Sequence, residues 1–443
     1  MIRLMLITDK CFVLVLVIGL LCLLRGLKKE HYRRAFVAVF KKPMVFCASL
    51  IFLFFLVIGI LDCVHVVNQT SSSTLLDRIL APLGETYEKT YSAPLALVSY
   101  VPETRLIKGH DQQVYLSLDY PKKHLQTLEA RRIFIKQVVL QALMLGFFVS
   151  FGGWGIWVIG RRLTQGILSF RPNNTEISAV VTCFIGVTIV FAGFWMSRDL
   201  HVLGTGKIGQ DIFYYAIKSI RTGLVIGLLT TLLMMPLALL LGIAAGYFGG
   251  IVDDVIQYIY TTLSSIPGVL LITAAVLSMQ TYIANHPQKF STLESSADAR
   301  LLALCFILGI TSWTSLCRLL RAEVLKLREV DYVSAAIALG SSSFKIIRKH
   351  LLPNVMHIVL ITLVLDFSFL VLAEAVLSYV GVGVSPMTMS WGNMINEARL
   401  ELARDPIVWW PMTAAFIFMF TLVLVSNLMA DAIRDVLDPH QRI

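Results

Sequence analysis

Residues 331–354 read DYVSAAIALGSSSFKIIRKHLLPN. The alanine-rich first half favours a short helix, and Gly340 permits a sharp turn after it. The serines at 341–343 can cap a second helix, which Pro353 is expected to end. An apolar stripe would follow one side of that second helix: Phe344, Ile346, Ile347, Leu351 and Leu352. The stretch predicts two short helices joined at a turn, a rigid knob that can pass force from a soluble partner to neighbouring helices.

Long apolar segments flank this knob in a chain of 443 residues. Hydrophobic residues make up 57% of the chain and charged residues 15%, whereas a soluble domain carries roughly 25% charged residues. The chain is therefore too apolar to be soluble, and a lipid bilayer is its expected solvent. The net charge of +10 comes from short basic runs between apolar segments, which are typical of cytoplasmic loops and do not indicate nucleic acid.

Eight segments are apolar over about the 20 residues that a membrane helix needs. They are 43–62, 134–160, 177–196, 216–246, 255–279, 301–318, 355–380 and 411–430. A ninth segment, 11–24, is short and could be a spanning helix, an interfacial helix or a signal-anchor-like start. Pro267 and Gly268 interrupt the segment 255–279, which predicts either a gating break or a static kink. The predicted fold is an all-α, multi-pass membrane protein.

Lysine and arginine residues orient these spans. The loop 25–42 is strongly basic and is placed in the cytoplasm: Arg25, Lys28, Lys29, Arg33, Arg34, Lys41 and Lys42 stand against the single acid Glu30. Alternation then places the other loops, with 63–133, 197–215 and 381–410 outside and 161–176, 319–354 and the C-terminus inside. Arg131 and Arg132 oppose this rule, because they fall at the outer end of a span. The knob at 331–354 is predicted to face the cytoplasm.

The sequence holds no phosphate-binding loop of the form G-x-x-x-x-G-K-[ST]. The segment 204–207, Gly-Thr-Gly-Lys, lacks the required first glycine and the serine or threonine after the lysine. ATP is therefore expected to bind another polypeptide, and the chain is not expected to be an enzyme. The nine histidines and seven cysteines show no spacing typical of metal or redox sites. No catalytic residue, cofactor or metal site is predicted.

The stretch 331–354 resembles the EAA loop of ABC importer permeases, which docks into a groove on the ATPase subunit. Five positions correspond to the family's alanine pair, turn glycine and terminal Leu-Pro: Ala335, Ala336, Gly340, Leu352 and Pro353. The family's acidic first position is Ser334 here, which affects one polar contact with the ATPase and leaves the docking itself expected. The alternative for this stretch is an interfacial helical hairpin that has no partner.

Further motifs resemble the C-type inner subunit of the oligopeptide, dipeptide and nickel permease family. They are LGTGKIGQD (203–211), AGYFGGIVDD (245–254), SSIPG (264–268), AEAVLSYVGVGVSP (373–386), SWGNMINEAR (390–399) and LDPHQR (437–442). In the first of them, four positions match the family pattern: Gly204, Thr205, Gly209 and Asp211. Three depart from it: Gly206, Lys207 and Gln210. The resemblance covers about 200–443, and the order and spacing of the motifs make it specific.

Four regions follow from these observations. Membrane segments with the basic loop occupy 1–62, an extracytoplasmic segment 63–133, an additional transmembrane hairpin 134–196, and an ABC permease domain 197–443 with its coupling loop at 319–354. The family usually has one N-terminal span, which 43–62 could supply. The additional hairpin is better explained as an accessory element that faces lipid than as an element that adds a new activity.

Asp366 and Glu374 lie inside the predicted helix 355–380. A charge in hydrocarbon costs at least ~2.5 kcal/mol, so such residues usually face a bundle interior or a cavity. They stand about 80° apart around the helix axis. One hypothesis is that both line the translocation path and attract a cationic group, such as the amino terminus of a peptide. The alternative is hydrogen bonding between helices, or simple solvation for Glu374, and this structural explanation is favoured for Glu374 only.

The resemblance implies a type I importer in a bacterial inner membrane, surrounded by membrane lipids. Its parts would be two different permease subunits, two ATP-binding cassette ATPase subunits and an extracytoplasmic substrate-binding protein, and it would work by alternating access. Peptides are the leading substrate, with nickel or another small solute as the alternative. From other classes, a membrane scaffold would not need an ATPase-docking knob. A secondary transporter would be expected to show inverted repeats, which the sequence lacks.

Overall fold

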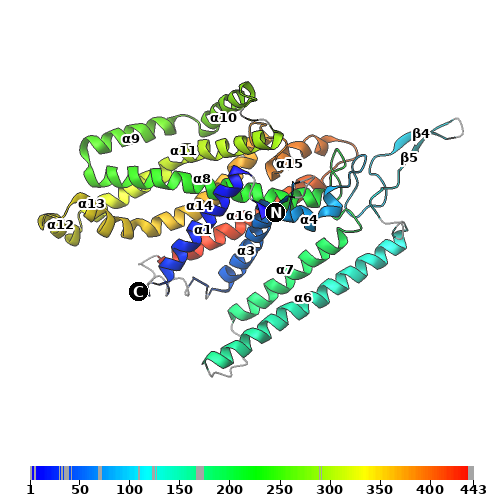
Figure 1. Cartoon of the computed structure of the whole chain (residues 1–443), viewed down its shortest axis with the longest axis horizontal. Helices are drawn as coiled ribbons and strands as arrows, with labels where there is room; N and C mark the ends of the chain where they lie inside the picture. Colours follow the sequence, from blue (N-terminus) through cyan, green and yellow to red (C-terminus); the bar gives the residue numbers. More distant parts are fainter. Residues whose placement is uncertain are drawn as a thin grey trace. The chain divides into compact units, whose positions relative to one another are not determined.

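The structure is a computed structural model that describes residues 2–3, 6–28, 30, 33, 39–40, 42–67, 72–107, 110–121, 125, 127–165, 174–288, 290 and 292–437. The described chain is mostly helical (Figure 1). Within these residues nine helices are long and apolar enough to cross a membrane. This confirms the predicted all-α, multi-pass fold. The basic residues Lys29, Arg34 and Lys41 and positions 438–442 of the closing motif lie outside the described residues.

Two compact units make up the chain. Unit 1 consists of Met1–Arg3, Val37–Arg221 and Met389–Val425, and unit 2 of Leu4–Phe36, Thr222–Thr388 and Ser426–Ile443. Two helices contribute to both units: α8 (Ile212–Phe248) and α16 (Trp410–Leu437).

Among the described residues, unit 1 contains three of the four candidate membrane helices that precede the permease motifs. They are α3 (Pro43–Cys63), α6 (Leu128–Gln165) and α7 (Asn174–Met196). The helices α6 and α7 pack on each other, and α7 also packs on α3. A Cβ added at Gly146 would overlap the Thr188 hydroxyl, so α6 and α7 approach closely at this point. The residues of the predicted hairpin, 134–196, thus lie in two helices that pack on each other.

The helix α6 is longer than the predicted span 134–160. Its 38 residues extend over about 57 Å, whereas the hydrocarbon core of a bilayer is about 30 Å thick. The part of α6 that precedes the predicted span carries Arg131, whose charge opposed the rule that orients spans by lysine and arginine. Its Nη1 donates a hydrogen bond to the Leu95 carbonyl at 2.8 Å, so this arginine ties α6 to the segment 63–133.

The parts of unit 1 between its long helices are built from short elements. A small antiparallel sheet has the order β1-β2-β3, and a separate hairpin pairs β4 with β5. The bounds are β1 (Ile2–Arg3), β2 (His65–Val67), β3 (Ser72–Thr74), β4 (Glu103–Ile107) and β5 (His110–Val114), with α4 (Leu75–Ile79) and α5 (Ala81–Gly84) between β3 and β4. The helix α15 (Trp391–Ala398) and the 3-10 turn η3 (Glu401–Ala403) follow later in the chain.

Lys218 near the start of α8 ties two of these elements together. Its ammonium lies 2.7 Å from Oδ1 of Asp77 in α4 and 3.5 Å from Oδ1 of Asp62 in α3. The Tyr214 hydroxyl donates a second bond to Asp77 at 2.8 Å. Asp77 also closes a capping box with Thr74 at the start of α4. This cluster fixes the C-terminal end of α3 to the first turns of α8.

The motif 203–211 docks the segment 63–133 onto the start of α8. The Thr205 hydroxyl accepts a bond from the Ser92 main-chain N–H at 2.6 Å and donates one to the Thr90 carbonyl at 2.9 Å. The Thr205 carbonyl in turn accepts a bond from the Trp410 indole at 3.0 Å. Asp211 caps α8 by accepting a bond from the Tyr214 main-chain N–H at 2.8 Å. The family pattern of this motif thus has a structural role in this chain.

A buried charge network lies beside this motif. His201 is fully buried, and its Nδ1 lies 2.6 Å from Oδ2 of Asp211. Its Nε2 lies 3.7 Å from Oε1 of Glu88, which is too long for a hydrogen bond but close enough for strong attraction between charges. Glu88 itself accepts bonds from the main-chain N–H groups of Asp119 and Tyr120. One imidazolium therefore balances two buried carboxylates.

We expect Gly209→Ala to release the segment around Glu88 from this motif. Gly209 has a φ of +76°, and an added Cβ would overlap the Glu88 main-chain carbonyl. The left-handed backbone alone costs ~1–2 kcal/mol for an L-residue, so the total loss should reach about 2 kcal/mol or more. Limited trypsin cleavage at Lys89 should become several times faster. Gly206→Ala is the matched control, because the three atoms nearest to its Cβ all belong to the flexible Gln210 side chain. Equal cleavage of the two variants would contradict this explanation.

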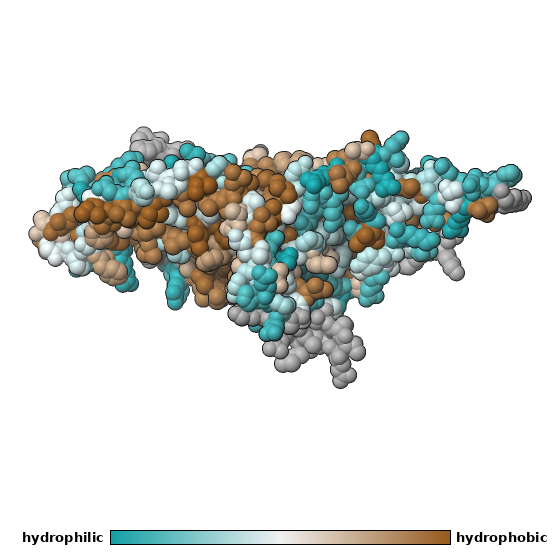
Figure 2. All heavy atoms as spheres, turned by 90° about the horizontal axis from the view of Figure 1, so that it is seen from above, coloured by the Kyte–Doolittle hydropathy of each residue, from teal (hydrophilic) through white to brown (hydrophobic). Residues whose placement is uncertain are grey.

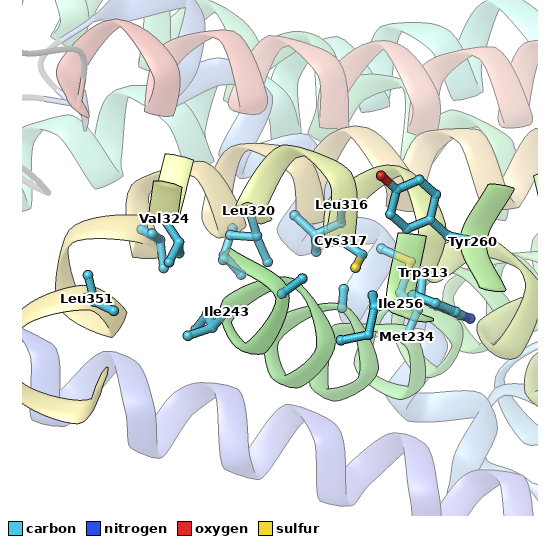
Figure 3. Close-up of a cluster of buried hydrophobic side chains, with 14 of the residues drawn as sticks. Met234, Ile243, Ile256, Tyr260, Trp313, Leu316, Cys317, Leu320, Val324 and Leu351 are labelled. Carbon is cyan, nitrogen blue, oxygen red and sulfur yellow. The ribbon is translucent and has the colours of Figure 1, made fainter. Parts of the chain in front are cut away.

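Unit 2 contains the permease motifs that surround the knob. Its helices are α1 (Ile7–Leu27), most of α8, α9 (Gly250–Ser265), α10 (Gly268–Asn285), α11 (Leu293–Arg328), α12 (Asp331–Ala338), α13 (Ser343–Ile346), the π-turn η2 (Ile347–Leu351), α14 (Leu352–Tyr379) and the end of α16. Buried apolar side chains from α8, α9 and α11 meet in one cluster (Figure 3). Gly242 and Gly246 let α8 approach α11 closely, since a Cβ at either position would crowd a carbonyl of α11.

The predicted single span 255–279 is wrong, because the helix breaks between α9 and α10. Ile266 and Pro267 have extended backbone angles, with ψ of 131° and 116°. Proline lacks an N–H and pushes the preceding residue out of the helical region, which explains the break. Only α10 is among the nine candidate spans. Figure 2 shows a broad apolar surface over the part of the view that holds α9 and α10, and their exposed apolar side chains include Ile251, Tyr258, Val269, Leu270 and Leu277.

The helix α1 is longer than the predicted segment 11–24 and is long enough to span a membrane. Asp298 of α11 caps its start by accepting bonds from the Ile7 main-chain N–H, at 2.9 Å, and from the Thr8 hydroxyl. A buried carboxylate at a helix N-terminus is favoured by the helix dipole. Of the three alternatives for this segment, a spanning helix anchored to α11 fits best.

Candidate coupling site

Gly340 forms the turn at the centre of the knob. It follows α12 with a φ of +73°, in the left-handed region that glycine favours. The Gly340 N–H donates to the Ile337 carbonyl at 2.9 Å, and the Ser341 N–H donates to the Ala336 carbonyl at 3.1 Å. These two bonds form a Schellman motif, which satisfies the last carbonyls of α12. The geometry explains why the chain has glycine at this position.

The base of the knob is held in the core of unit 2. Val333 of α12 is fully buried, and Ala336 is nearly so. Both belong to the buried apolar cluster of unit 2, together with Ile346 and Leu351 from the second half of the knob. Figure 3 labels Leu351 among them. Ala335 and Ser334, in contrast, are exposed on the outer side of α12. Both halves therefore share one core and should move as a single body.

A polar contact also joins the two halves. The Asn354 amide donates a hydrogen bond to the Tyr332 hydroxyl at 2.8 Å. The Tyr332 and His350 rings lie beside each other, with centroids 5.9 Å apart. Sequence reasoning missed this contact, because nothing in the pattern pairs two residues that lie 22 positions apart.

The tip of the knob is apolar and exposed. Leu339 is 85% exposed and Phe344 is 73% exposed, and Ile337 beside them is about half exposed. The predicted apolar stripe of the second helix is therefore divided, since Ile346 and Leu351 are buried whereas Phe344 points away from the core. A protein surface with large apolar side chains at a rigid projection is typical of a site that another protein covers.

The prediction that Pro353 ends the second helix is wrong. The helical path continues from α13 through η2 into α14, and Pro353 lies in the first turn of α14. Proline is tolerated in a first turn, and the wider π-turn before it avoids the clash with the carbonyl four residues earlier. Ser342 is the capping residue of α13, but its side chain makes no capping hydrogen bond. The knob is thus continuous with the long membrane helix α14.

Arg321 of α11 holds the neighbouring turn between α8 and α9. Its guanidinium forms a bidentate pair with Asp253, with Nη2 2.6 Å from Oδ2. The hydrogen bond and charge of Arg321 lower the pKa of the Asp253 carboxyl below its usual value. Arg328 adds a bond to the Tyr247 carbonyl at 3.3 Å. Because the partners lie far apart in sequence, these contacts could not be predicted from the motif 245–254.

Asp366 and Glu374 lie along α14, away from the knob. They follow Leu352 by about 21 Å and 33 Å along the helix axis. Asp366 is half-buried. Glu374 is only 3% exposed, and its Oε1 accepts a bond from the Ser378 hydroxyl at 2.7 Å. The alternative that Glu374 is simply solvated is therefore wrong. The side chain is buried and hydrogen-bonded instead. The structure does not bring these two residues together with the coupling residues.

Comparison with known proteins gives one family. Residues 238–443 match the family described as binding-protein-dependent transport system inner membrane component. The dipeptide transport system permease protein of Lactococcus lactis subsp. cremoris is 30% identical over 55% of this chain and 65% of its own length, just under two thirds. A putative peptide transport system permease protein of Brucella suis biovar 1 is 31% identical over 55% of this chain and 75% of its own length.

A third relative matches over a longer stretch of this chain. The oligopeptide transport system permease protein of Bacillus subtilis is 27% identical over 63% of this chain and 90% of its own length. Members of this family are permease components of the bacterial inner membrane and are not ATPases, which agrees with the missing phosphate-binding loop. The chain belongs to the binding-protein-dependent transport system inner membrane components, the ABC importer permeases that its motifs resemble.

Proposed function

We propose that this chain is the C-type permease subunit of an ATP-driven importer of peptides. Relatives named as permeases for dipeptides, oligopeptides and glutathione support a peptide-like substrate. The partners would be two ATP-binding cassette ATPase subunits, a sister permease and an extracytoplasmic substrate-binding protein. The chain itself would bind and move the substrate, while the ATPase subunits hydrolyse ATP.

The exposed tip of the knob is the observation that carries this proposal. Leu339 and Phe344 would insert into the ATPase, and the buried base would transmit the movement. Because η2 joins the knob to α14 without a break, displacement of the tip would turn into displacement of that membrane helix. ATP drives this change only if it binds one arrangement of the ATPase subunits better than the other. The result would be alternating access to a path between this chain and its sister permease.

Asp366 is proposed to line that path and to attract the amino terminus of a peptide. Asp366→Asn keeps the size of the side chain and removes its charge. We expect the preference for peptides with a free amino terminus over acetylated ones to fall roughly fivefold, which corresponds to about 1 kcal/mol. The measurement is competition between the two forms for uptake. Glu374→Gln, on the same helix but buried, is the control and should leave the preference unchanged. An unchanged preference in Asp366→Asn would return Asp366 to a structural role.

Uptake in cells tests the substrate class. A strain that lacks this chain should lose uptake of labelled di- or tripeptides and regain it when the chain is restored. An excess of unlabelled peptide should block the restored uptake, whereas nickel ions and free amino acids should not. Normal peptide uptake in the deletion strain, with loss of nickel uptake instead, would favour the alternative substrate.

A further inference from the structure

A cavity of about 350 Å³ lies in unit 2 among three candidate membrane helices. One residue comes from α11, five from the first half of α14 and one from α16: Leu319, His357, Ile358, Ile361, Thr362, Leu365 and Arg434. Nothing in the proposed coupling or transport path uses this cavity. Its position, just beyond the knob along α14, puts it at the cytoplasmic end of these helices.

The lining combines apolar walls with two polar groups. Leu319, Ile358 and Leu365 supply apolar surface. The Arg434 side chain is exposed, and among the residues that the structure describes its guanidinium has no hydrogen bond or ion pair. Arginine is always charged and binds phosphate and carboxylate groups well. The charge that complements this cavity is therefore an anion.

His357 adds a second polar contact. Its Nδ1 lies 2.6 Å from the Asn354 carbonyl oxygen, and because a carbonyl only accepts, Nδ1 carries the proton of that bond. The other ring nitrogen, Nε2, has no partner among the described residues and can accept a bond from a hydroxyl. A ligand with both an anionic group and a hydroxyl would satisfy Arg434 and His357 together.

An exposed apolar stripe continues from the cavity along α14. Leu365, Phe369, Leu372 and Val376 are all exposed and recur at helical spacing on one side of the helix. At about 30 Å³ for a group the size of water, the cavity holds roughly a dozen such groups, enough for a polar headgroup but not for long acyl chains. The stripe offers a surface outside the cavity on which the acyl chains of a lipid could lie.

We propose that this cavity binds an anionic phospholipid of the cytoplasmic leaflet, with its phosphate on Arg434 and a headgroup hydroxyl on His357. The acyl chains lie along the exposed stripe of α14. Basic pockets between membrane helices on the cytoplasmic side are suited to such headgroups. Phosphatidylglycerol has a net negative charge and headgroup hydroxyls for the two polar contacts, whereas phosphatidylethanolamine has no net charge and no headgroup hydroxyl, so Arg434 should attract it less. This site does not depend on which substrate the importer carries.

The test measures lipid binding to the purified full chain, together with any subunits that co-purify. The protein is delipidated, phosphatidylglycerol is added, and bound lipid is counted by native mass spectrometry. Arg434→Gln should bind phosphatidylglycerol about fivefold more weakly, the effect of about 1 kcal/mol per basic residue at the membrane surface. Lys326→Gln is the matched control and should have no effect. It removes an exposed charge near the C-terminal end of α11, the helix that supplies Leu319, but Lys326 does not line the cavity.

A second variant tests the cavity itself. Ile361→Trp keeps Arg434 but fills part of the space, and it should also lower the binding of phosphatidylglycerol. Circular dichroism should show native helix content in each variant. Equal binding by the wild-type protein and both variants would overturn the proposal, and so would equal binding of phosphatidylethanolamine. Absence of bound phosphatidylglycerol in the assembled wild-type complex would also overturn it, since another subunit would then cover the cavity.

Discussion

Gly340→Asp is expected to abolish ATP-dependent uptake while the chain still inserts into the membrane. A Cβ at Gly340 meets nothing within 4 Å, so the new side chain does not disturb the core of unit 2. The left-handed backbone costs less for aspartate than for most residues, because Asn and Asp visit this region more readily. The main effect is a carboxylate at the apolar tip beside Leu339. An unpaired charge in a buried interface costs about 3–5 kcal/mol, so ATPase affinity should fall at least about a hundredfold.

Gly340→Asn separates the charge from the backbone strain. Asparagine has the same shape as aspartate and tolerates the same φ, but it carries no charge. We expect this variant to retain much of its uptake and of its ATPase association. Both variants should reach the membrane at wild-type levels, measured by immunoblot of membrane fractions. Wild-type association of Gly340→Asp with the ATPase would contradict the docking role of the knob.

His201→Leu is expected to cause the largest loss of stability in unit 1. The change leaves the buried carboxylates of Glu88 and Asp211 without the cation that balances them. Removing one partner from a buried ion pair costs about 3–5 kcal/mol. Thermal unfolding followed by circular dichroism should show this loss. Arg105→Leu is the control, because its pair with Glu103 is exposed and should contribute at most about 1 kcal/mol.

A double variant makes the test specific for charge. Glu88→Gln together with His201→Leu removes one of the two uncompensated carboxylates, so it should recover part of the lost stability. If the double variant is no more stable than His201→Leu alone, lost packing rather than lost charge accounts for the effect. A change of less than about 1 kcal/mol in His201→Leu itself would contradict the buried charge network.

The stability that His201 contributes should also depend on pH. Burial alone would lower the pKa of His201, but the hydrogen bond to Asp211 and the negative charge of Glu88 outweigh burial and raise this pKa to about 9. Because the folded pKa lies above the unfolded value of about 6.5, the contribution is complete below about pH 6.5. It is then lost as the pH rises through about 9. The melting temperatures of wild type and His201→Leu should therefore converge above that pH.

Much of the fold follows from apolar length alone. Each predicted span except 255–279 corresponds to one helix, because hydrocarbon leaves the backbone few other ways to satisfy its polar groups. The sequence showed that Pro267 interrupts the helix. It did not show that the interruption separates two helices instead of kinking one. The length of α6 was underestimated because its first turns are polar and lie outside the apolar window. Arg131 could be explained only by its contact with Leu95, a residue 36 positions away.

The candidate site was predictable where local chemistry decides it. Gly340 could be identified as the turn, because few residues other than glycine adopt a positive φ readily. The role of Pro353 was missed because the sequence does not show the π-turn that accommodates it. The burial of Glu374 was missed because hydropathy does not say which side of a helix faces the protein. The residues that fix the knob, such as Tyr332 and Asn354, depend on contacts that only the folded chain shows.

Co-purification tests the central claim most directly. The tagged chain would be solubilised in mild detergent from its native membrane, and the proteins recovered with it would be identified by mass spectrometry. We predict recovery of an ATP-binding cassette ATPase and a sister permease, with the ATPase lost on Gly340→Asp and retained on Gly340→Asn. Recovery of neither protein, under conditions that preserve a control transporter, would contradict the account and favour a membrane scaffold.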